Sequence, residues 1–218
     1  MLEAEIKFIL HEDFYYRRLV NEVARSFSLS MKTDHLRPVR TIDRYFDTDS
    51  LAFLMKDASL RIRERRFITK TQSEGRMTLK TPDSRSVNLK LALVRHERKL
   101  NLEGWHWDRI REFFSELGVV LAGGPVKPII TVEALSEEIQ LGEGEQHLHL
   151  SLDNLTYIDE ASFTHKRETI LEIESHGYPV NVLEDIGAFC QEKYKLTCIK
   201  ESNYERGMKK VGLYPDKG

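Results

Sequence analysis

Charged residues alternate with aliphatic residues in several short segments of this chain, and this pattern constrains the fold more than any other feature. Residues 3–7 read Glu-Ala-Glu-Ile-Lys, and residues 171–174 read Leu-Glu-Ile-Glu. In a β-strand, side chains at i and i+2 share a face, so each segment places two carboxylates side by side. Like charges this close together repel each other. We therefore expect these carboxylates to hold a cation between them.

The same alternation recurs in the middle of the chain. Arg61, Arg63 and Arg65 share one face of a predicted strand, and Leu60 and Ile62 share the other. An antiparallel sheet with one solvated face gives the same pattern. However, the helices of the chain need an apolar sheet face to cover, which would turn the charged faces toward a common interior. The sequence therefore favours an α+β fold with a closed barrel and a polar, charged lumen.

Hydrophobic periodicity predicts the elements of this fold. Alternation predicts strands over residues 1–10, 41–46, 60–65, 76–81, 94–102, 129–135, 139–141, 147–153 and 169–175. Helical spacing predicts helices over residues 12–28, 107–117 and 181–195. The sequence has no internal repeat and no interdomain linker. We therefore expect a single domain over residues 1–210 and a C-terminal tail over residues 211–218.

Composition excludes several classes of protein. The 218 residues carry a formal net charge of -2, which argues against a dedicated nucleic-acid surface. The only cysteines, Cys190 and Cys198, do not form a metal-ligand spacing or a disulfide framework. The sequence lacks a signal-peptide pattern, a membrane-spanning apolar run and a Gly-rich phosphate loop. We expect a cytoplasmic protein with no membrane partner, as a monomer or a homodimer.

A charged lumen has an electrostatic cost. Unpaired charges in a poorly hydrated cavity cost roughly several kcal/mol each. The paired glutamates at 3, 5, 172 and 174 suit Mg²⁺ or Mn²⁺, which prefer carboxylate oxygen. The lysines and arginines suit a polyanion, since arginine offers a bidentate fork to phosphate oxygens. A divalent ion that bridges the carboxylates to a phosphate chain would neutralise both sets of charges.

Several short motifs follow one another in order from residue 3 to about residue 207. They are Glu3-x-Glu5-x-Lys7, Tyr45–Thr48, Leu60–Arg63, Thr78–Lys80, Arg95-x-Glu97, Asp153 and Glu172-x-Glu174. This ordered set resembles the CYTH superfamily of triphosphate tunnel metalloenzymes. That superfamily includes inorganic and thiamine triphosphatases, class IV adenylyl cyclases and fungal RNA triphosphatases.

The resemblance implies an eight-stranded antiparallel β-barrel, or tunnel, with the helices packed outside. It implies metal-site roles for Glu3, Glu5, Glu97, Asp153, Glu172 and Glu174. It implies phosphate-binding roles for Lys7, Arg61, Arg63, Lys80 and Arg95, and Lys200 is a further candidate for such a role. Catalytic roles are expected for Glu5, Glu174 and Lys200.

The chain departs from the family pattern at two places. The family carries a Lys-x-Arg pair on the strand before the one that bears Asp153, and here Ala134 and Ser136 occupy that region. One phosphate clamp is therefore expected to be missing. Near the C-terminus, Asn203 stands where the family has lysine, and the nearby Lys200 is a candidate replacement.

Three functions fit these residues. The first is hydrolysis, with Mg²⁺ or Mn²⁺, of inorganic triphosphate or of a small organic triphosphate such as thiamine triphosphate. The second is a class IV-type adenylyl cyclase that makes cyclic AMP from ATP. The third is a non-catalytic module that binds polyphosphate or a nucleotide, which the missing Lys-x-Arg pair favours.

Two further pairs of residues are assigned without a firm role in the chemistry. His147 and His149 are expected to face solvent, and Tyr45 and Asp47 have either a structural or a ligand-binding role.

Overall fold

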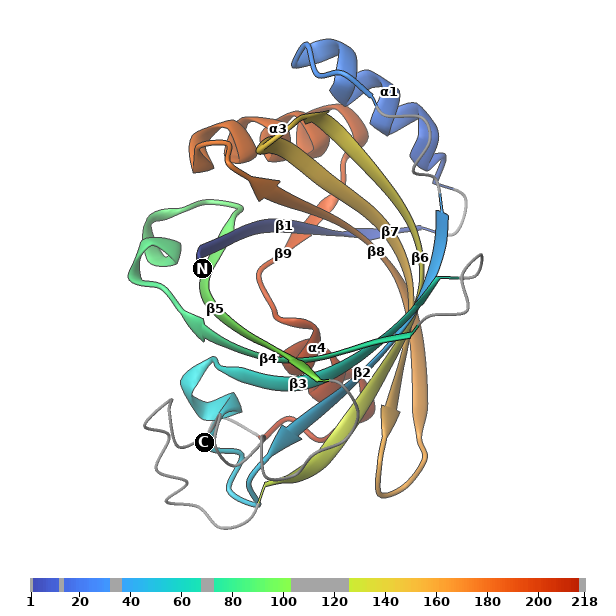
Figure 1. Cartoon of the computed structure of the whole chain (residues 1–218), viewed down its shortest axis with the longest axis vertical. Helices are drawn as coiled ribbons and strands as arrows, with labels where there is room; N and C mark the ends of the chain where they lie inside the picture. Colours follow the sequence, from blue (N-terminus) through green and yellow to red (C-terminus); the bar gives the residue numbers. More distant parts are fainter. Residues whose placement is uncertain (1, 12–13, 32–36, 68–72, 103–125, 216–218) are drawn as a thin grey trace.

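The computed structural model describes residues 2–11, 14–31, 37–67, 73–102 and 126–215. Within these ranges the chain forms nine β-strands and three α-helices (Figure 1). The strands are β1 (Leu2–Leu10), β2 (Arg37–Asp47), β3 (Ser59–Phe67), β4 (Ser73–Pro82), β5 (Leu93–Leu102), β6 (Lys127–Glu143), β7 (Gln146–Asp159), β8 (His165–His176) and β9 (Thr197–Ile199). The helices are α1 (Tyr16–Ser26), α3 (Val180–Tyr194) and α4 (Asn203–Val211), with short 3₁₀ helices η2 (Leu54–Lys56) and η3 (Ser84–Asn88).

Eight of the strands close into an antiparallel barrel. Their order is β5-β4-β3-β2-β6-β7-β8-β1, and an additional pairing of β5 with β1 completes the circle. The ninth strand, β9, pairs with residues 7–9 of β1, beyond the residues of β1 that pair with β5. Figure 1 shows α1 and α3 on one side of the barrel and α4 on the opposite side. The expected eight-stranded tunnel with external helices is confirmed.

The apolar faces of the strands point outward, toward the helices. Ile6 and Phe8 of β1 belong to one buried cluster with Leu183 and Ile186 of α3 and Leu19 of α1. The alternate positions of β1 point inward and are also buried, although they carry charges. Burial of the aliphatic residues contributes about 25 cal/mol per Å² of apolar area, and it fixes the direction of the charged side chains.

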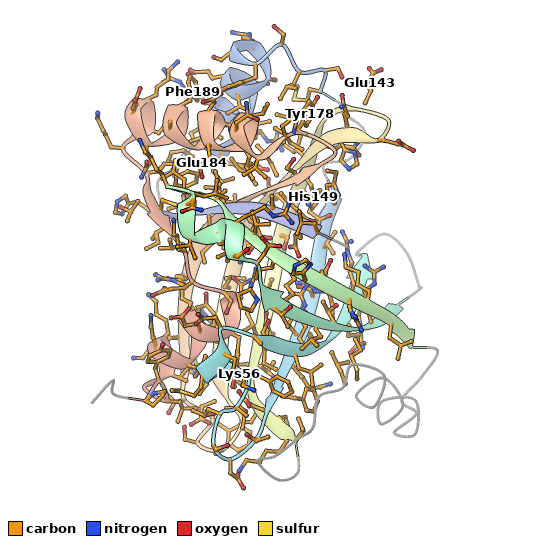
Figure 2. The ribbon with its side chains drawn as sticks, turned by 90° about the vertical axis from the view of Figure 1, so that its left-hand side faces the viewer. Lys56, Glu143, His149, Tyr178, Glu184 and Phe189 are labelled. Carbon is orange, nitrogen blue, oxygen red and sulfur yellow. The ribbon has the colours of Figure 1, made fainter. Side chains whose placement is uncertain are left out.

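Helix α3 is also fixed to the barrel by a carboxylate. Glu184, labelled in Figure 2, accepts hydrogen bonds from the backbone N–H groups of Lys90 (3.1 Å) and Leu91 (2.9 Å). It also accepts one from the N–H of Ala92 (2.5 Å). These N–H groups lie just before β5 and would otherwise lack partners in the ladder. The contact therefore ties the helix to the strand that closes the barrel.

Several element boundaries differ from the predicted ones. A single strand, β6, replaces the two strands predicted over residues 129–135 and 139–141, because Ser136 and Glu138 continue the inward alternation with polar side chains. Strand β9 and helix α4 are not predicted by the periodicity, since each is short. The helix predicted over residues 107–117 lies outside the described residues, as do residues 12–13 of the first helix.

The C-terminal helix α4 packs closely against the barrel. A Cβ atom on Gly207 would lie 2.1 Å from Ile130 Cδ1 and 2.7 Å from Tyr157 Cδ1, so only glycine fits there. The ring of Tyr204 stacks on that of Tyr45 with centroids 5.3 Å apart. This packing explains the buried position of Tyr45, which also lines the tunnel.

None of the helices in the described part of the chain has the length and apolar character needed to span a membrane.

Asp47 organises the segment after β2. Its carboxylate accepts hydrogen bonds from the backbone N–H groups of Thr48 (2.7 Å), Phe53 (3.0 Å) and Leu54 (3.0 Å). It also accepts one from the hydroxyl of Tyr204 on α4 (2.9 Å). The side chain is fully buried and does not line the tunnel. Of the two roles considered for Asp47, the contacts favour the structural one.

We predict that Asp47→Ala lowers the free energy of unfolding by about 3 kcal/mol, because four buried donors lose their acceptor. Urea unfolding followed by circular dichroism measures this change. The matched control is Asp49→Ala, because the side chain of Asp49 is 69% exposed and pairs with Lys127 at the surface. The control should cost less than about 1 kcal/mol. Similar losses in both variants would contradict the structural role of Asp47.

Candidate metal and phosphate site

The interior of the barrel forms a tunnel with a cavity volume of about 270 Å³. All eight barrel strands and the start of α4 contribute side chains to its wall. Among the described lining residues, eight carry carboxylates: Glu3, Glu5, Asp43, Glu97, Glu138, Asp153, Glu172 and Glu174. Eight others are cationic: Lys7, Arg61, Arg63, Arg65, Arg76, Lys80, Arg95 and Lys99. The charges of the tunnel wall are therefore balanced before any ligand binds.

Three carboxylates converge at one point of the wall. Glu3 of β1 and Glu172 and Glu174 of β8 each offer an oxygen, and these atoms lie within 4.8 Å of one another. The antiparallel pairing of β1 with β8 brings them together. Glu3 Oε2 is buried and accepts no hydrogen bond from any described residue. A cluster of carboxylate oxygens with an unused buried acceptor suits a hard divalent cation such as Mg²⁺ or Mn²⁺.

The other three predicted metal ligands line the same tunnel outside this cluster. Glu5 pairs with Arg95 and with Lys7 Nζ (3.1 Å). Glu97 pairs with Lys99 Nζ, and Asp153 accepts a hydrogen bond from Ser151 Oγ (3.0 Å). These carboxylates therefore already have partners within the protein.

Burial and neighbouring charges separate the proton affinities of these groups. Burial, followed by the charge of Glu3, raises the pKa of Glu174 to about 7. Burial and the charge of Glu172 raise the pKa of Asp153 to about 6. Burial alone would also raise the pKa of Glu5, but Arg95, Lys7 and Lys80 hold it well below its usual range. Glu5 is thus fixed as an anion, while Glu174 can exchange a proton near neutral pH.

Five of the six predicted phosphate-binding residues line the tunnel: Lys7, Arg61, Arg63, Lys80 and Arg95. Lys80 Nζ lies 2.5 Å from Glu3 Oε1, and Lys7 Nζ lies 3.2 Å from Glu172 Oε2. Cations of the phosphate-binding set thus contact members of the acidic cluster directly. This arrangement supports the idea that metal and phosphate sites adjoin.

The sixth residue, Lys200, lies elsewhere. Its Nζ donates a hydrogen bond to the backbone oxygen of Leu89 (2.5 Å), and its side chain lines a second cavity beside the tunnel. The residue that meets Lys7 from the C-terminal segment is Asn203, whose Oδ1 accepts a hydrogen bond from Lys7 Nζ (3.1 Å). Lys200 therefore does not replace the missing lysine in this structure.

The expected gap in the phosphate clamp is visible on β6. Its tunnel-lining residues are Val132, Ala134, Ser136 and Glu138, which include no lysine or arginine. Two carboxylates on the same side of the barrel, Asp43 and Glu138, instead bind the arginines of β3. This part of the wall is therefore acidic where the family pattern is basic.

Sequence reasoning missed several residues of the tunnel wall, among them Asp43, Glu138 and His149. Asp43 lies opposite Arg63 in the pairing of β2 with β3 and accepts hydrogen bonds from Arg61 and Arg63. Asp43 stands two residues before Tyr45 on the same strand, and this spacing could have predicted that the two side chains share a face. His149 was expected to face solvent, but it lines the tunnel and its Nε2 lies 3.4 Å from Glu138 Oε2. The prediction for His149 is wrong because β7 continues its inward alternation past Ser151.

We predict that the metal-free protein loses stability as the pH rises from 5.5 to 8. Glu174 has a raised folded-state pKa, so its contribution is fully present below its unfolded-state pKa and is lost as the pH rises through about 7. Linkage gives a loss of about 2 kcal/mol in the free energy of unfolding over this range. Thermal unfolding in chelator should show the decline, and excess Mn²⁺ should reduce it.

Glu174→Gln should remove most of this decline, whereas the exposed Glu143→Gln should leave it in place. A pH dependence that is identical in both variants would show that Glu174 is not its source.

Comparison with known proteins gives the family of the chain. Among solved structures, the PH1819 protein of Pyrococcus horikoshii OT3 has a TM-score of 0.57 at 20% identity, over 95% of this chain and 99% of that one. A candidate adenylate cyclase from Vibrio parahaemolyticus has a TM-score of 0.52 at 16% identity, over 94% and 97% of the two chains. These likenesses show a shared fold. No curated protein matches the sequence. The sequence profile of the CYTH domain matches residues 1–189, and the chain therefore belongs to the CYTH family.

Proposed function

We propose that this protein is a metal-dependent triphosphatase that hydrolyses inorganic triphosphate or a small organic triphosphate such as thiamine triphosphate. One observation carries the proposal. Glu3 belongs to the three-carboxylate cluster and at the same time contacts Lys80, with Oε1 2.5 Å from Nζ. A cation on the cluster and an anion on Lys80 would therefore be immediate neighbours, as phosphoryl transfer to water requires.

Each part of the tunnel has a role in this proposal. Glu3, Glu172 and Glu174 would hold the divalent ion, which when bound would neutralise phosphate charge and activate a water molecule. Arg61 and Arg95 would hold phosphate oxygens through their guanidinium groups. Lys80, a single positive charge, would leave its contact with Glu3 and pair with a phosphate oxygen instead. Glu5 would keep Arg95 and Lys7 in place through its fixed negative charge.

Glu174 is the residue best suited to move a proton. Its pKa of about 7 lets its carboxylate accept a proton near neutral pH. The same group is a candidate metal ligand, so protonation and metal binding would compete there. Lys200 has no part in the proposal, since its side chain lies outside the tunnel.

A specific observation favours adenylyl cyclase activity as the second candidate. A second cavity of about 270 Å³ adjoins the tunnel, and Arg95 and Ser202 line both. Its wall includes the apolar residues Leu54, Ala58 and Leu93, which could accommodate a nucleobase. The third candidate, a binding module without turnover, is favoured by the absence of a basic pair at Ala134 and Ser136.

Product analysis distinguishes the three functions. The protein is incubated with Mg²⁺ or Mn²⁺ and with inorganic triphosphate, thiamine triphosphate or ATP. Release of orthophosphate supports the triphosphatase, and formation of cyclic AMP with pyrophosphate supports the cyclase. Binding by calorimetry without any product would support the binding module and reject the first proposal.

We predict that Arg61→Ala and Lys80→Ala each weaken triphosphate binding by about 10- to 100-fold, since each loses a charged hydrogen bond to phosphate. Folding should change by less than about 1 kcal/mol, because Asp43 still pairs with Arg63 and the divalent ion can neutralise Glu3. Calorimetry with Mg²⁺ measures binding, and urea unfolding with Mg²⁺ measures stability. The surface variant Arg66→Ala, whose side chain is 61% exposed, is the control for charge alone. Losses of stability that match the losses of binding would refute a ligand-binding role.

A further inference from the structure

The arginines of β3 form a row along the tunnel. Arg61, Arg63 and Arg65 occupy alternate positions of the strand, so successive Cα atoms in the row are about 6.6 Å apart. Arg61 lies opposite Tyr45, which stacks on α4, and Arg65 contacts Glu138. The row therefore runs from the end of the tunnel near α4 toward the opposite end, which we call the far end.

Asp43 binds the two arginines of this row unequally. Arg63 donates to it through both Nε (2.6 Å to Oδ1) and Nη2 (2.6 Å to Oδ2), so the guanidinium fork is held in a bidentate pair. Arg61 donates to it through Nη1 alone (3.0 Å to Oδ2), and Arg61 Nε has no hydrogen-bond partner among the described residues. Arg61 thus keeps donors for a ligand, whereas Asp43 already fills the fork of Arg63.

The next arginine of the row, Arg65, also contacts a carboxylate, through one nitrogen of its guanidinium. Glu138 of β6 accepts a hydrogen bond from Arg65 Nη2, and its Oε2 lies 3.4 Å from His149 Nε2. Arg63 and Arg65 are therefore both bound to carboxylates of the protein itself.

These pairs differ from the pairs near the acidic cluster. Lys80 Nζ lies 2.5 Å from Glu3 and farther from Glu5 (3.9 Å) and Glu97 (4.0 Å). A divalent ion would engage Glu3 and so free the shortest of these contacts for phosphate. Asp43 and Glu138 lie outside that cluster, so a metal there does not release Arg63 or Arg65. Because both carboxylates are fixed to strands of the barrel, they compete with any incoming phosphate at high effective concentration.

We infer that Asp43 and Glu138 act as internal anions that end the row of phosphate-binding side chains, so that the tunnel accepts a triphosphate and discriminates against longer linear polyphosphates. The carboxylate of Asp43 fills the guanidinium fork of Arg63, and that of Glu138 takes the Nη2 donor of Arg65, so further phosphate groups would have to displace both. This inference deepens the proposed function, since it concerns the substrate of the same tunnel. It concerns binding, however, and can be tested whether or not hydrolysis occurs.

The test compares the binding of inorganic triphosphate and inorganic tetraphosphate by calorimetry with Mg²⁺ present. The wild-type protein should bind triphosphate at least tenfold more tightly than tetraphosphate. Asp43→Asn should tighten tetraphosphate binding at least tenfold and change triphosphate binding less than threefold. Asp83→Asn is the matched control, because Asp83 holds Arg85 in a similar bidentate pair outside the tunnel. The control should change neither affinity.

A double variant, Asp43→Asn with Arg63→Gln, shows whether the tighter tetraphosphate binding of Asp43→Asn depends on the released Arg63. The double variant should bind tetraphosphate no more tightly than the wild-type protein. If Asp43→Asn does not fold, Glu138→Gln tests the same release at Arg65, again by the change in tetraphosphate affinity. Equal affinities of the wild-type protein for both anions, or equal gains for both in Asp43→Asn, would overturn the inference. Selective binding without phosphate release would reject the proposed hydrolysis alone, whereas no binding of triphosphate would reject both.

Discussion

The structure depends on the neutralisation of charge inside a closed barrel. Within the described parts of the chain, eight carboxylates and eight lysines or arginines line the tunnel, and several of them are almost completely buried. Isolated charges in such a place would cost roughly several kcal/mol each, even after relaxation. The barrel avoids this cost because acids and bases from different strands pair across the lumen. The apolar faces of the same strands bind the helices, so the polar interior and the external core follow from one alternation.

The internal pairs also suggest how ligands would enter without leaving buried charges unpaired. Lys80 Nζ lies against Glu3 and supplies to the acidic cluster the positive charge that a bound divalent ion would supply. Asp43 lies against Arg61 and Arg63, where a phosphate oxygen could otherwise bind. A cation and a polyanion that arrive together would replace the pair of Lys80 with Glu3, because each supplies the charge that the other displaces, whereas the bidentate pair of Arg63 with Asp43 would stay in place. A ligand of only one sign would leave some groups without a partner.

Much of this arrangement could be predicted from the sequence, because a period of two is a local property. The alternation around Glu3, Arg61 and Glu172 was enough to predict inward charges, and the resemblance to the CYTH superfamily implied the eight-stranded barrel. The composition of the acidic cluster could not be predicted, since it depends on the register between β1 and β8. That register sets Glu5 opposite Glu174 and Lys7 opposite Glu172, yet the side chain of Glu5 pairs with Arg95, and it is Glu3 whose oxygen approaches those of Glu172 and Glu174.

Other features lie beyond local patterns for similar reasons. Strand β6 continues through Ser136 and Glu138, where polar side chains on the inner face hide its alternation. Lys200 is close in sequence to Asn203, yet the chain leaves β9 on the outside of the barrel and only Asn203 reaches Lys7. Proximity along the chain was therefore a poor guide in the short connection between β9 and α4.

The central claim is that cation and oligophosphate satisfy the tunnel together, and the coupling between their binding energies tests it most directly. Calorimetric titration of inorganic triphosphate with and without Mn²⁺, and of Mn²⁺ with and without triphosphate, gives this coupling. The account predicts that each ligand raises the affinity for the other by the same factor, of about tenfold or more, after correction for the complex that the two form in solution. Affinities that are independent of the other ligand would contradict it.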